Sequence, residues 1–510
     1  MNMTKAQIGI MISITIYLVA MVMVGVLYAK KTKNVGDFYL GGRKLGPLVT
    51  AMSAEASDMS SYLLMGLPGL ALASGLAEVG WTVIGLAIGT YLNWLIVAKR
   101  LRKYSEHIGA ITIPDFFAKR YHDEHNIITA IAAIMIIIFF VPYTASGFAA
   151  CGKLFGTLFG IDYHLAMIVS AIVIVGYTSL GGFTAASITD FIQSIIMTIA
   201  LLIVLIFGIH QAGGVDAILE NAKSLDGYLN FFQGYNAETN SAGSYSILSV
   251  ISTLAWGLGY FGMPHILLRF MAIEDPEKIK LSRRVATVWV VISMAVAVAI
   301  GVVGMGMVKH GALPAFADSE TVIVQVASLL SQKSFIAALL AGVILAGILA
   351  STMSTADSQL LAASSAASEN IIGGLFKVKL TERSEMVVAR STLIIISVIG
   401  VFLAWDSDAS VFRIVSFAWA GFGAVFGPLM LLSLFWKRGN RYGAVAGMVV
   451  GGIMVFAWKY GIAKLGGAFA VYELLPAFLL GLVTNVVVSL LTPAPEQKVI
   501  DDFDYVKTLN

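Results

Sequence analysis

Apolar stretches long enough to cross a lipid bilayer recur along almost the whole chain, and they constrain its fold more than any other feature. A helix needs about 20 apolar residues to cross the bilayer core. Such stretches cover residues 8–29, 47–72, 77–98, 126–152, 161–181, 188–211, 246–270, 283–308, 334–367, 386–404, 410–436, 441–462 and 470–491. Only 12% of the 510 residues are charged, against 58% hydrophobic, which leaves too few polar residues for a water-facing surface. The sequence therefore predicts an all-α integral membrane protein with about 13 transmembrane helices and no soluble catalytic domain.

The remaining composition argues against several classes of function. A net charge of +3 gives no reason to expect a nucleic-acid partner, and no segment indicates an obligate protein partner. Cys151 is the only cysteine, so we exclude an intrachain disulfide and a cysteine metal site and expect a small packed residue there. The seven histidines form no HExxH motif, and no pore-loop filter is found. We therefore expect neither an enzyme nor a channel, and the tail after residue 492 is too short for a signalling domain.

The distribution of basic residues predicts the orientation in the membrane. Of the 33 Lys and Arg residues, 25 lie in alternate loops, in the adjoining helix ends and in the C-terminal tail, and 8 lie on the opposite side. Because cytoplasmic loops carry the excess of Lys and Arg, we expect the N-terminus outside and the C-terminus in the cytoplasm. The acidic 212–245 loop, with Asp216, Glu220, Asp226 and Glu238, is then outside. The first helix should be retained, because its basic cluster (Lys30, Lys31 and Lys33) follows the apolar run instead of preceding it as in a signal peptide.

Two of the stretches are interrupted by polar residues, Gly and Pro. The first has a polar run at 53–61 with Glu55 and Asp58, followed by a Gly-Leu-Pro-Gly segment at 66–69. The second has three glycines and a proline within residues 256–265. If residues 47–211 and 246–436 are two five-helix units, both interruptions fall on the first helix of a unit and the second unit is inverted. Matched interruptions in inverted repeats indicate a midplane binding site of a secondary transporter, although glycines also serve close helix packing.

Ionisable and hydroxyl side chains inside the stretches suggest where an ion binds. Asp58 is a costly residue at membrane depth and so a functional candidate, whereas Glu55 lies either at such a depth or in a watery vestibule. Within 334–367 one polar stripe has i, i+3, i+4, i+7 spacing, formed by Ser351, Ser354, Thr355 and Ser358 and flanked by Asp357. Hydroxyls and freed carbonyls are the hard oxygen ligands that Na⁺ prefers, but such hydroxyls also bond to their own helix. Asp190 is either a second buried carboxylate or an interfacial residue.

Seven blocks in order carry a resemblance to a known family. They are LGGRKLGP from residue 40, SDMSSYLLMGLPG from 57, GGFTAASITDFIQ from 181, WGLGYFGMPHILLRFM from 256, MSTADSQLL from 353, FAWAGFGAVFGP from 417 and WKRGNRYGAVAGM from 436. On these blocks the chain resembles the sodium/solute symporter family, and within it the bacterial branch that couples sodium to proline. The resemblance implies a leucine-transporter-type 5+5 inverted-repeat core with an extra N-terminal helix (8–29), two peripheral C-terminal helices (441–491) and a tail (492–510).

The resemblance also implies the ligands. The family's sodium site matches the carbonyls of Ala56, Met59 and Ser351 and the side chains of Ser354 and Thr355, with Asp58 important for sodium use. Proline recognition in similar proteins matches Ser60, Tyr143, Trp256, Tyr260 and Pro264. The i, i+4, i+8 spacing of the last three by itself predicts one helix face.

Some positions depart from the family pattern. Ser61 and Tyr62 often read as Gly and Trp in similar proteins. Asp357 stands where several members carry a serine that, with the aspartate matched by Asp190, lines a second sodium site. With Ser358 beside them, these two carboxylates would hold a second cation or share a proton. The resemblance therefore implies import of L-proline by sodium symport across the plasma membrane, without a cofactor and with Na⁺ as coupling ion. The alternative is another small solute, such as a different amino acid, a compatible solute, an acidic sugar or a vitamin.

Overall fold

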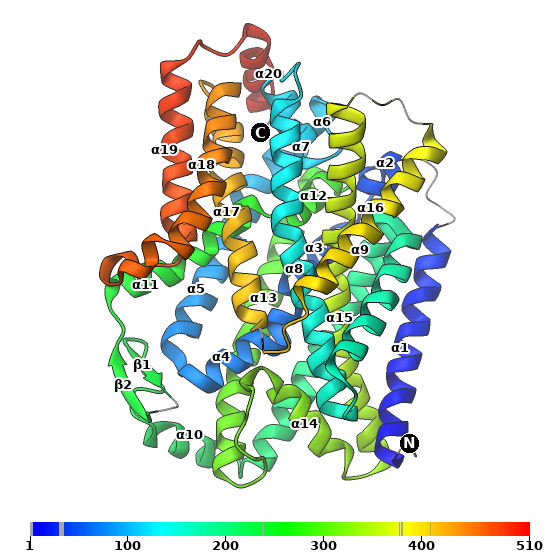
Figure 1. Cartoon of the computed structure of the whole chain (residues 1–510), viewed down its shortest axis with the longest axis vertical. Coiled ribbons are helices and arrows are strands. Elements are labelled where there is room, and N and C mark those ends of the chain that lie inside the picture. The colour runs from blue at the N-terminus through cyan, green and yellow to red at the C-terminus, as the bar shows by residue number, and fades with distance from the viewer. Residues whose placement is uncertain are drawn as a thin grey trace.

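The chain is built almost entirely of helices in the computed structural model (Figure 1). The structure describes residues 4–29, 35–236, 239–376, 378, 381–408 and 410–509. The long helices are α1 (Lys5–Ala29), α5 (Leu76–Leu92), α8 (Ile127–Phe159), α9 (Tyr163–Gln211), α13 (Ile279–Lys309), α15 (Phe335–Ser365), α16 (Glu382–Leu403), α17 (Val411–Phe435), α18 (Arg441–Tyr460) and α19 (Leu474–Leu491). Two further spans are interrupted: α3 (Pro47–Ser61), η2 (Tyr62–Gly66) and α4 (Leu67–Ser74) form one, and α11 (Ile247–Leu254), η4 (Ala255–Gly262) and α12 (Pro264–Ala272) form the other.

Short elements connect these helices outside the apolar band. On one side of the membrane they are α10 (Val215–Ser224), the hairpin of β1 (Gln233–Asn236) and β2 (Ser241–Ser244), η6 (Ser319–Thr321), α14 (Val322–Ser331), η8 (Ile462–Leu465) and η9 (Gly467–Phe469). On the other side are α2 (Val35–Leu40), η1 (Gly41–Arg43), α6 (Ala98–His107), α7 (Ile113–Arg120), η5 (Pro276–Lys278) and α20 (Gln497–Thr508). The π-helical turns η3 (Asn93–Val97) and η7 (Ala366–Leu375) extend α5 and α15. The 212–245 loop is thus partly ordered as α10 and an antiparallel hairpin.

The number of membrane-spanning helices can be compared with the expected thirteen. Within the described residues, nine helices are long and apolar enough to span a bilayer, or ten if the bent α11–η4–α12 pair counts as one. The other three expected spans fall on the α3–η2–α4 segment, on the first part of α9 and on α16. The apolar parts of α9 and α16 at these positions, 163–176 and 387–403, are shorter than the other spans. The α3–η2–α4 segment carries the polar run at 53–61.

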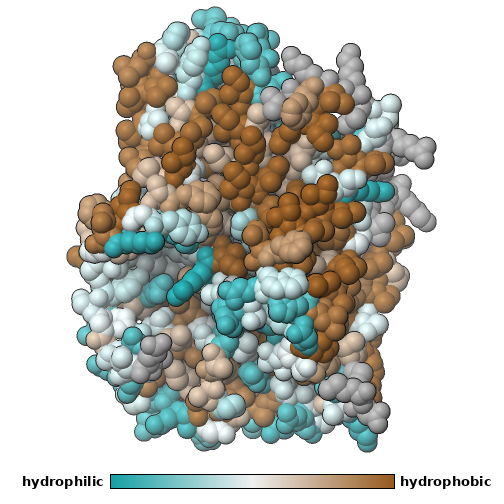
Figure 2. Space-filling model, in the orientation of Figure 1, coloured by the Kyte–Doolittle hydropathy of each residue, from teal (hydrophilic) through white to brown (hydrophobic). Residues whose placement is uncertain are grey.

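The two ends of the chain lie at opposite ends of the molecule. In Figure 1, α1 begins at the bottom and α20 lies at the top. Figure 2 shows apolar residues over much of the upper part and the right side of the visible face, with hydrophilic residues at its top, across its middle left and centre, and in its lower part. Ile16, Ile206 and Phe402, on three different spans, are each at least 65% exposed, as expected for lipid-facing side chains. Glu238 and the basic cluster at residues 30, 31 and 33 lie outside the described residues.

The interruptions expected from the sequence are real breaks in the helices. Ser60 has φ 48° and ψ −168°, so the path of α3 changes direction there. The second interrupted helix bends by 46° between η4 and α12. A further break at Gly182 (φ 64°, ψ −174°) divides α9 into the two spans expected at 161–181 and 188–211. The boundaries of the two five-helix units, 47–211 and 246–436, remain a prediction.

The glycines of η4 also serve close packing. A Cβ atom on Gly257 would lie 2.2 Å from the carbonyl oxygen of Gly85 in α5, and one on Gly262 would lie 2.2 Å from the carbonyl oxygen of Phe422 in α17. No side chain fits into such a gap. The two explanations offered by the sequence, helix interruption and close packing, therefore hold for the same segment.

Candidate functional site

The residues expected to hold sodium come together where α3 meets α15. The Ser354 hydroxyl donates to the carbonyl of Ala56 at 2.9 Å and to the carbonyl of Ser351 at 3.2 Å. The Thr355 hydroxyl also donates to Ser351 O, at 3.1 Å. All four residues are buried. Four of the five expected ligand residues thus form one hydrogen-bonded group. Ser354 and Thr355 both bond to a carbonyl of their own helix, and Ser354 also bonds to the carbonyl of Ala56 in α3.

The fifth expected ligand, the carbonyl of Met59, lies in the turn where α3 breaks. It accepts a hydrogen bond from the backbone N–H of Tyr62, which Ser60 O shares. The Ser60 hydroxyl also accepts from this N–H, at 3.1 Å. A non-glycine residue with the backbone angles of Ser60 costs on the order of 1–3 kcal/mol. Such a strained backbone persists only where the surrounding structure fixes it. The packing around Ser60 therefore fixes the broken turn beside the candidate ion ligands.

Asp58 connects three helices around the break. Its Oδ2 accepts from the Tyr260 hydroxyl of η4 at 2.6 Å, and its backbone carbonyl accepts from the Tyr143 hydroxyl of α8 at 3.2 Å. Its other carboxylate oxygen is buried and has no hydrogen-bond partner in the described part of the chain. The structure thus brings Asp58, Tyr143 and Tyr260 together, and an unsatisfied carboxylate oxygen is an attractive position for a cation or a donor.

A small cavity adjoins both the break and the hydroxyls of α15. It is lined by residues of α3, α8 and α15, among them Ser60, Ser61, Tyr143, Thr355 and Gln359. Its volume of about 10 Å³ accommodates about one water molecule. A solute the size of an amino acid would therefore fit only if these helices moved apart.

Gln359 is a site residue that the sequence reasoning missed. Its Oε1 accepts from the Thr144 hydroxyl at 3.0 Å, while its Nε2 is buried without a partner among the described groups. The available signal was its spacing, because it lies four residues after Thr355 and so on the same helix face.

Trp256, Tyr260 and Pro264 do not share a face, and the prediction from their spacing is wrong. The segment η4 is a 3₁₀-helix, in which three residues make a turn, so residues four apart point in different directions. Trp256 lines one cavity with Phe412, and Pro264 lines a separate cavity with Leu361. Of these three described residues, Tyr260 is the one whose side chain is hydrogen-bonded to Asp58.

Trp256 belongs to an aromatic cluster near the break at Ser60. Its ring lies 5.6 Å from that of Tyr62, 5.5 Å from that of Phe412 and 5.2 Å from that of Tyr472. Phe412 also lines an open vestibule of about 1400 Å³. Through Phe412 the cluster adjoins this vestibule, and through Tyr62 it adjoins the break at Ser60.

A second buried cluster surrounds Arg269, which the sequence reasoning did not select. Its Nη2 donates to Asp190 Oδ2 at 3.0 Å and to Ser358 Oγ at 2.5 Å, and its Nε donates to Ser53 Oγ at 2.9 Å. The Ser358 hydroxyl donates to Asp357 Oδ1 at 3.2 Å. The expected grouping of Asp190, Asp357 and Ser358 is thus present, and Asp190 is fully buried instead of interfacial.

The structure also shows where Glu55 and Cys151 lie. Glu55 is buried and accepts from Trp94 Nε1 at 2.8 Å and Thr90 Oγ1 at 3.1 Å, so the vestibule alternative is wrong. Cys151 is buried and free. Among the described residues, no group of three or more His, Cys, Asp or Glu side chains is arranged to hold a metal ion.

Comparison with known proteins defines the class. The model of the sodium:solute symporter family matches residues 38–451, and the chain belongs to this family of membrane transporters. More particularly, it is 41% identical to the osmoregulated proline transporter OpuE of Bacillus subtilis, over 96% of each chain. It is 39% identical to sodium/proline symporter 2 of Staphylococcus saprophyticus, over 100% of this chain and 98% of that one.

The fold is likewise found among solved structures. A Na⁺-coupled sialic acid symporter in its substrate-bound outward-open state superposes with a TM-score of 0.78 at 19% identity, over 96% of this chain and 99% of that one. The expected family and the expected leucine-transporter-type helical fold are both confirmed.

Proposed function

We propose that this chain imports L-proline by symport with Na⁺ through alternating access. The observation that carries the proposal is the hydrogen bond from Ser354 to Ala56 O, which joins α15 to the broken helix beside a cavity lined by Ser60 and Thr355. Two relatives near 40% identity are named as transporters of proline, one of them as a sodium symporter, and this supports both the solute and the ion.

In this proposal the ion binds between α3 and α15. The ligands are the carbonyls of Ala56, Met59 and Ser351 and the hydroxyls of Ser354 and Thr355. These are five uncharged hard oxygens, the ligand type that small hard cations prefer. The two hydroxyl protons turn away from the carbonyls, so that both oxygens present lone pairs to Na⁺. Ion binding thus replaces the single hydrogen bond between α15 and α3, from Ser354 to Ala56 O, by ion contacts between the same two helices.

Proline binds next to the ion after the small cavity has widened. Its carboxylate meets backbone N–H groups at the break near Ser60, where the half-helix dipole favours an anion. Tyr143 and Tyr260 border this position through their contacts with Asp58, and Trp256 closes it towards the vestibule. Pro264 contributes to the path on the other side of the break.

The energetics allow coupling to a single ion. One Na⁺ moving down 100 mV releases about 2.3 kcal/mol, and a tenfold ion gradient adds about 1.4 kcal/mol. The sum, roughly 3.7 kcal/mol, supports an accumulation of about 500-fold at 1:1 coupling.

The Arg269 cluster bears on the number of ions. Its single guanidinium compensates one carboxylate, Asp190, to which it is bonded at 3.0 Å. Asp357 is equally buried and needs a second positive charge, because an uncompensated buried charge is costly. A proton or a second cation bound with Ser358 supplies that charge. Measuring the reversal potential of proline-coupled current as the Na⁺ and H⁺ gradients are varied separately distinguishes the two.

We place the protein in the plasma membrane, with the N-terminus outside and the C-terminus in the cytoplasm. The excess of Lys and Arg on the side of α6, α7 and α20 supports this orientation. The large vestibule with Phe412 then opens to the outside, which suits import.

Uptake of labelled L-proline into proteoliposomes tests the function. The purified protein is supplied with an inward Na⁺ gradient, with K⁺ in its place, or with an ionophore that collapses the gradient. We expect concentrative uptake with the Na⁺ gradient alone. Absence of proline uptake, with Na⁺ still altering protease sensitivity, would overturn the solute and favour another small solute. Absence of any response to Na⁺ would overturn the ion site.

A further inference from the structure

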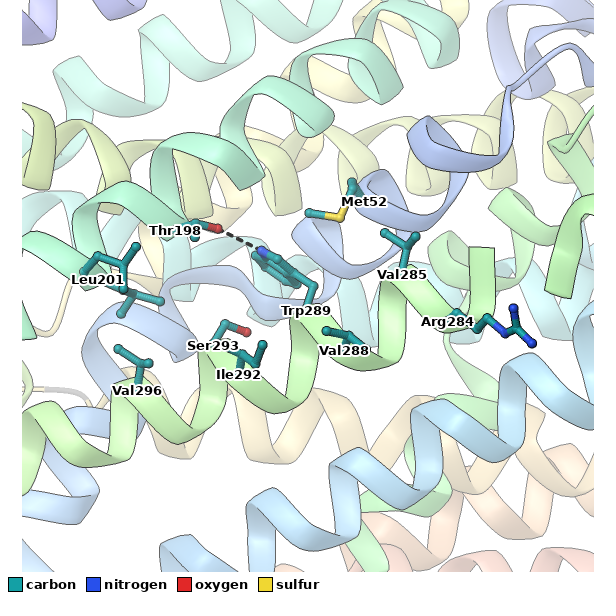
Figure 3. A pocket seen from close by; sticks show the side chains of 11 residues that line it. Met52, Thr198, Leu201, Arg284, Val285, Val288, Trp289, Ile292, Ser293 and Val296 are labelled. Carbon is teal, nitrogen blue, oxygen red and sulfur yellow. Dashed lines mark hydrogen bonds between the residues drawn. The ribbon is translucent and has the colours of Figure 1, made fainter. Parts of the chain in front are cut away.

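A long apolar groove runs between α9 and α13, away from the ion and solute candidates (Figure 3). Its volume is about 520 Å³. One wall is formed by α13 from Arg284 to Val296, and the other by α9 from Thr198 to Leu202, while Met52 of α3 also lines it. The groove is therefore bordered by the half of α3 that precedes the break at Ser60.

The groove opens towards the lipid. Val288, Ile292 and Leu202 line it and are 58%, 56% and 45% exposed, on helices that cross the bilayer. Its polar atoms are satisfied internally: Trp289 Nε1 donates to Thr198 Oγ1 at 2.9 Å, as Figure 3 shows, and Ser293 Oγ donates to Val290 O at 3.2 Å. The groove thus presents an apolar surface to an apolar occupant.

The length of the groove matches one leaflet of a bilayer. Arg284 and Val296 are 12 residues apart on one helix, which corresponds to about 18 Å of axial rise. Half of the hydrocarbon core is about 15 Å thick. A single acyl chain lying along α13 would therefore reach from the interface to about the bilayer midplane.

A free positive charge lies at the mouth of the groove. Arg284 is exposed and, in the described part of the chain, has no acidic partner. In Figure 3 its guanidinium lies at one end of the row of apolar side chains. Its neighbour Arg283 is engaged elsewhere, with its guanidinium 5.5 Å from the centre of the Tyr91 ring. This end of α13 follows η5, where Glu277 pairs with Lys99 of α6, and so belongs to the basic side of the protein.

We propose that the groove is a binding site for one anionic phospholipid of that leaflet. Its acyl chain lies along Trp289 and Ile292, and its phosphate and anionic headgroup are held by Arg284. A neutral or zwitterionic lipid offers the same chain but no net negative charge, so Arg284 gives the site its selectivity. The bound chain contacts Met52, and lipid composition thereby acts on the helix that carries the ion ligands.

Fluorescence quenching tests the site on the full-length chain. The purified protein in detergent micelles is titrated with bromine-labelled phosphatidylglycerol or phosphatidylcholine, and the Trp289 signal is obtained as the difference from Trp289→Phe. We expect saturable quenching of Trp289 by phosphatidylglycerol at lower concentration than by phosphatidylcholine. Arg284→Gln should weaken phosphatidylglycerol binding about fivefold, and Arg283→Gln should leave it unchanged.

A second pair of variants tests the acyl-chain part of the site without changing the charge of Arg284. Val288→Phe fills the groove and should reduce quenching by both lipids, whereas Val291→Phe, on an exposed position outside the groove, should not. Equal binding of the two lipids, an equal loss in the two arginine variants, or quenching that does not depend on Trp289 would each overturn the proposal.

Discussion

Replacing Ser354 by Ala is the sharpest test of the ion site. The change removes one of five oxygen ligands, and an oxygen contact with a charged group contributes about 1.5–3 kcal/mol. It also removes the hydrogen bond to Ala56 O, seen at 2.9 Å, whose loss costs the ion-free protein about 0.5–1.5 kcal/mol. Because the second loss partly offsets the first, the net weakening of Na⁺ binding is about 1–1.5 kcal/mol, or about tenfold.

The assay is initial proline uptake as a function of Na⁺ at saturating proline. We expect the half-saturating Na⁺ concentration to rise about tenfold in Ser354→Ala, with little change of the maximal rate. Ser351→Ala is the matched control, since its hydroxyl bonds to Ile348 O at 2.8 Å and only its carbonyl is expected to face the ion. Equal shifts in the two variants, or no shift in Ser354→Ala, would refute the assignment of hydroxyl and carbonyl ligands.

Three further predictions concern the solute, the buried charge and the packing. Tyr143→Phe should raise the proline concentration for half-maximal uptake and leave the Na⁺ dependence nearly unchanged, and the reverse pattern would contradict its placement. Arg269→Gln should destabilise the protein by about 3–5 kcal/mol in thermal unfolding, because Asp190 then stays buried without its partner. Adding Asp190→Asn should restore part of that loss; if it restores none, the Arg269–Asp190 pair is not the cause of the destabilisation. Gly257→Ala should lower thermal stability and uptake because its Cβ would meet backbone of α5 at 2.2 Å, while Gly176→Ala, with open space around it, should be neutral.

The sequence predicted the parts of the site that follow from helix periodicity. Ser351, Ser354 and Thr355 recur at helical spacing, and α15 is a regular helix through them, so their shared face could be predicted. The same reasoning was wrong for Trp256 and Pro264, because nothing in residues 255–262 distinguishes a 3₁₀-helix from an interrupted α-helix.

Contacts between distant segments were beyond sequence reasoning. Arg269 stands among the apolar residues of α12, and its partner Asp190 is 79 residues away. Neither spacing nor composition indicates which basic residue meets which carboxylate across a helix bundle. The aromatic cluster of Trp256, Phe412 and Tyr472 could not be predicted for the same reason, since its members come from three separate parts of the chain.

The contact between η4 and α5 limits how the protein can change shape. Side-chain interfaces adapt by rotamer changes, but Gly257 and Gly85 meet through backbone atoms, which have no rotamers. We therefore expect these two elements to move together in a transport cycle. We then expect bending where the chain is already interrupted, at Ser60, at Met263 and at Gly182, so that short joints carry the rearrangement between outward and inward access.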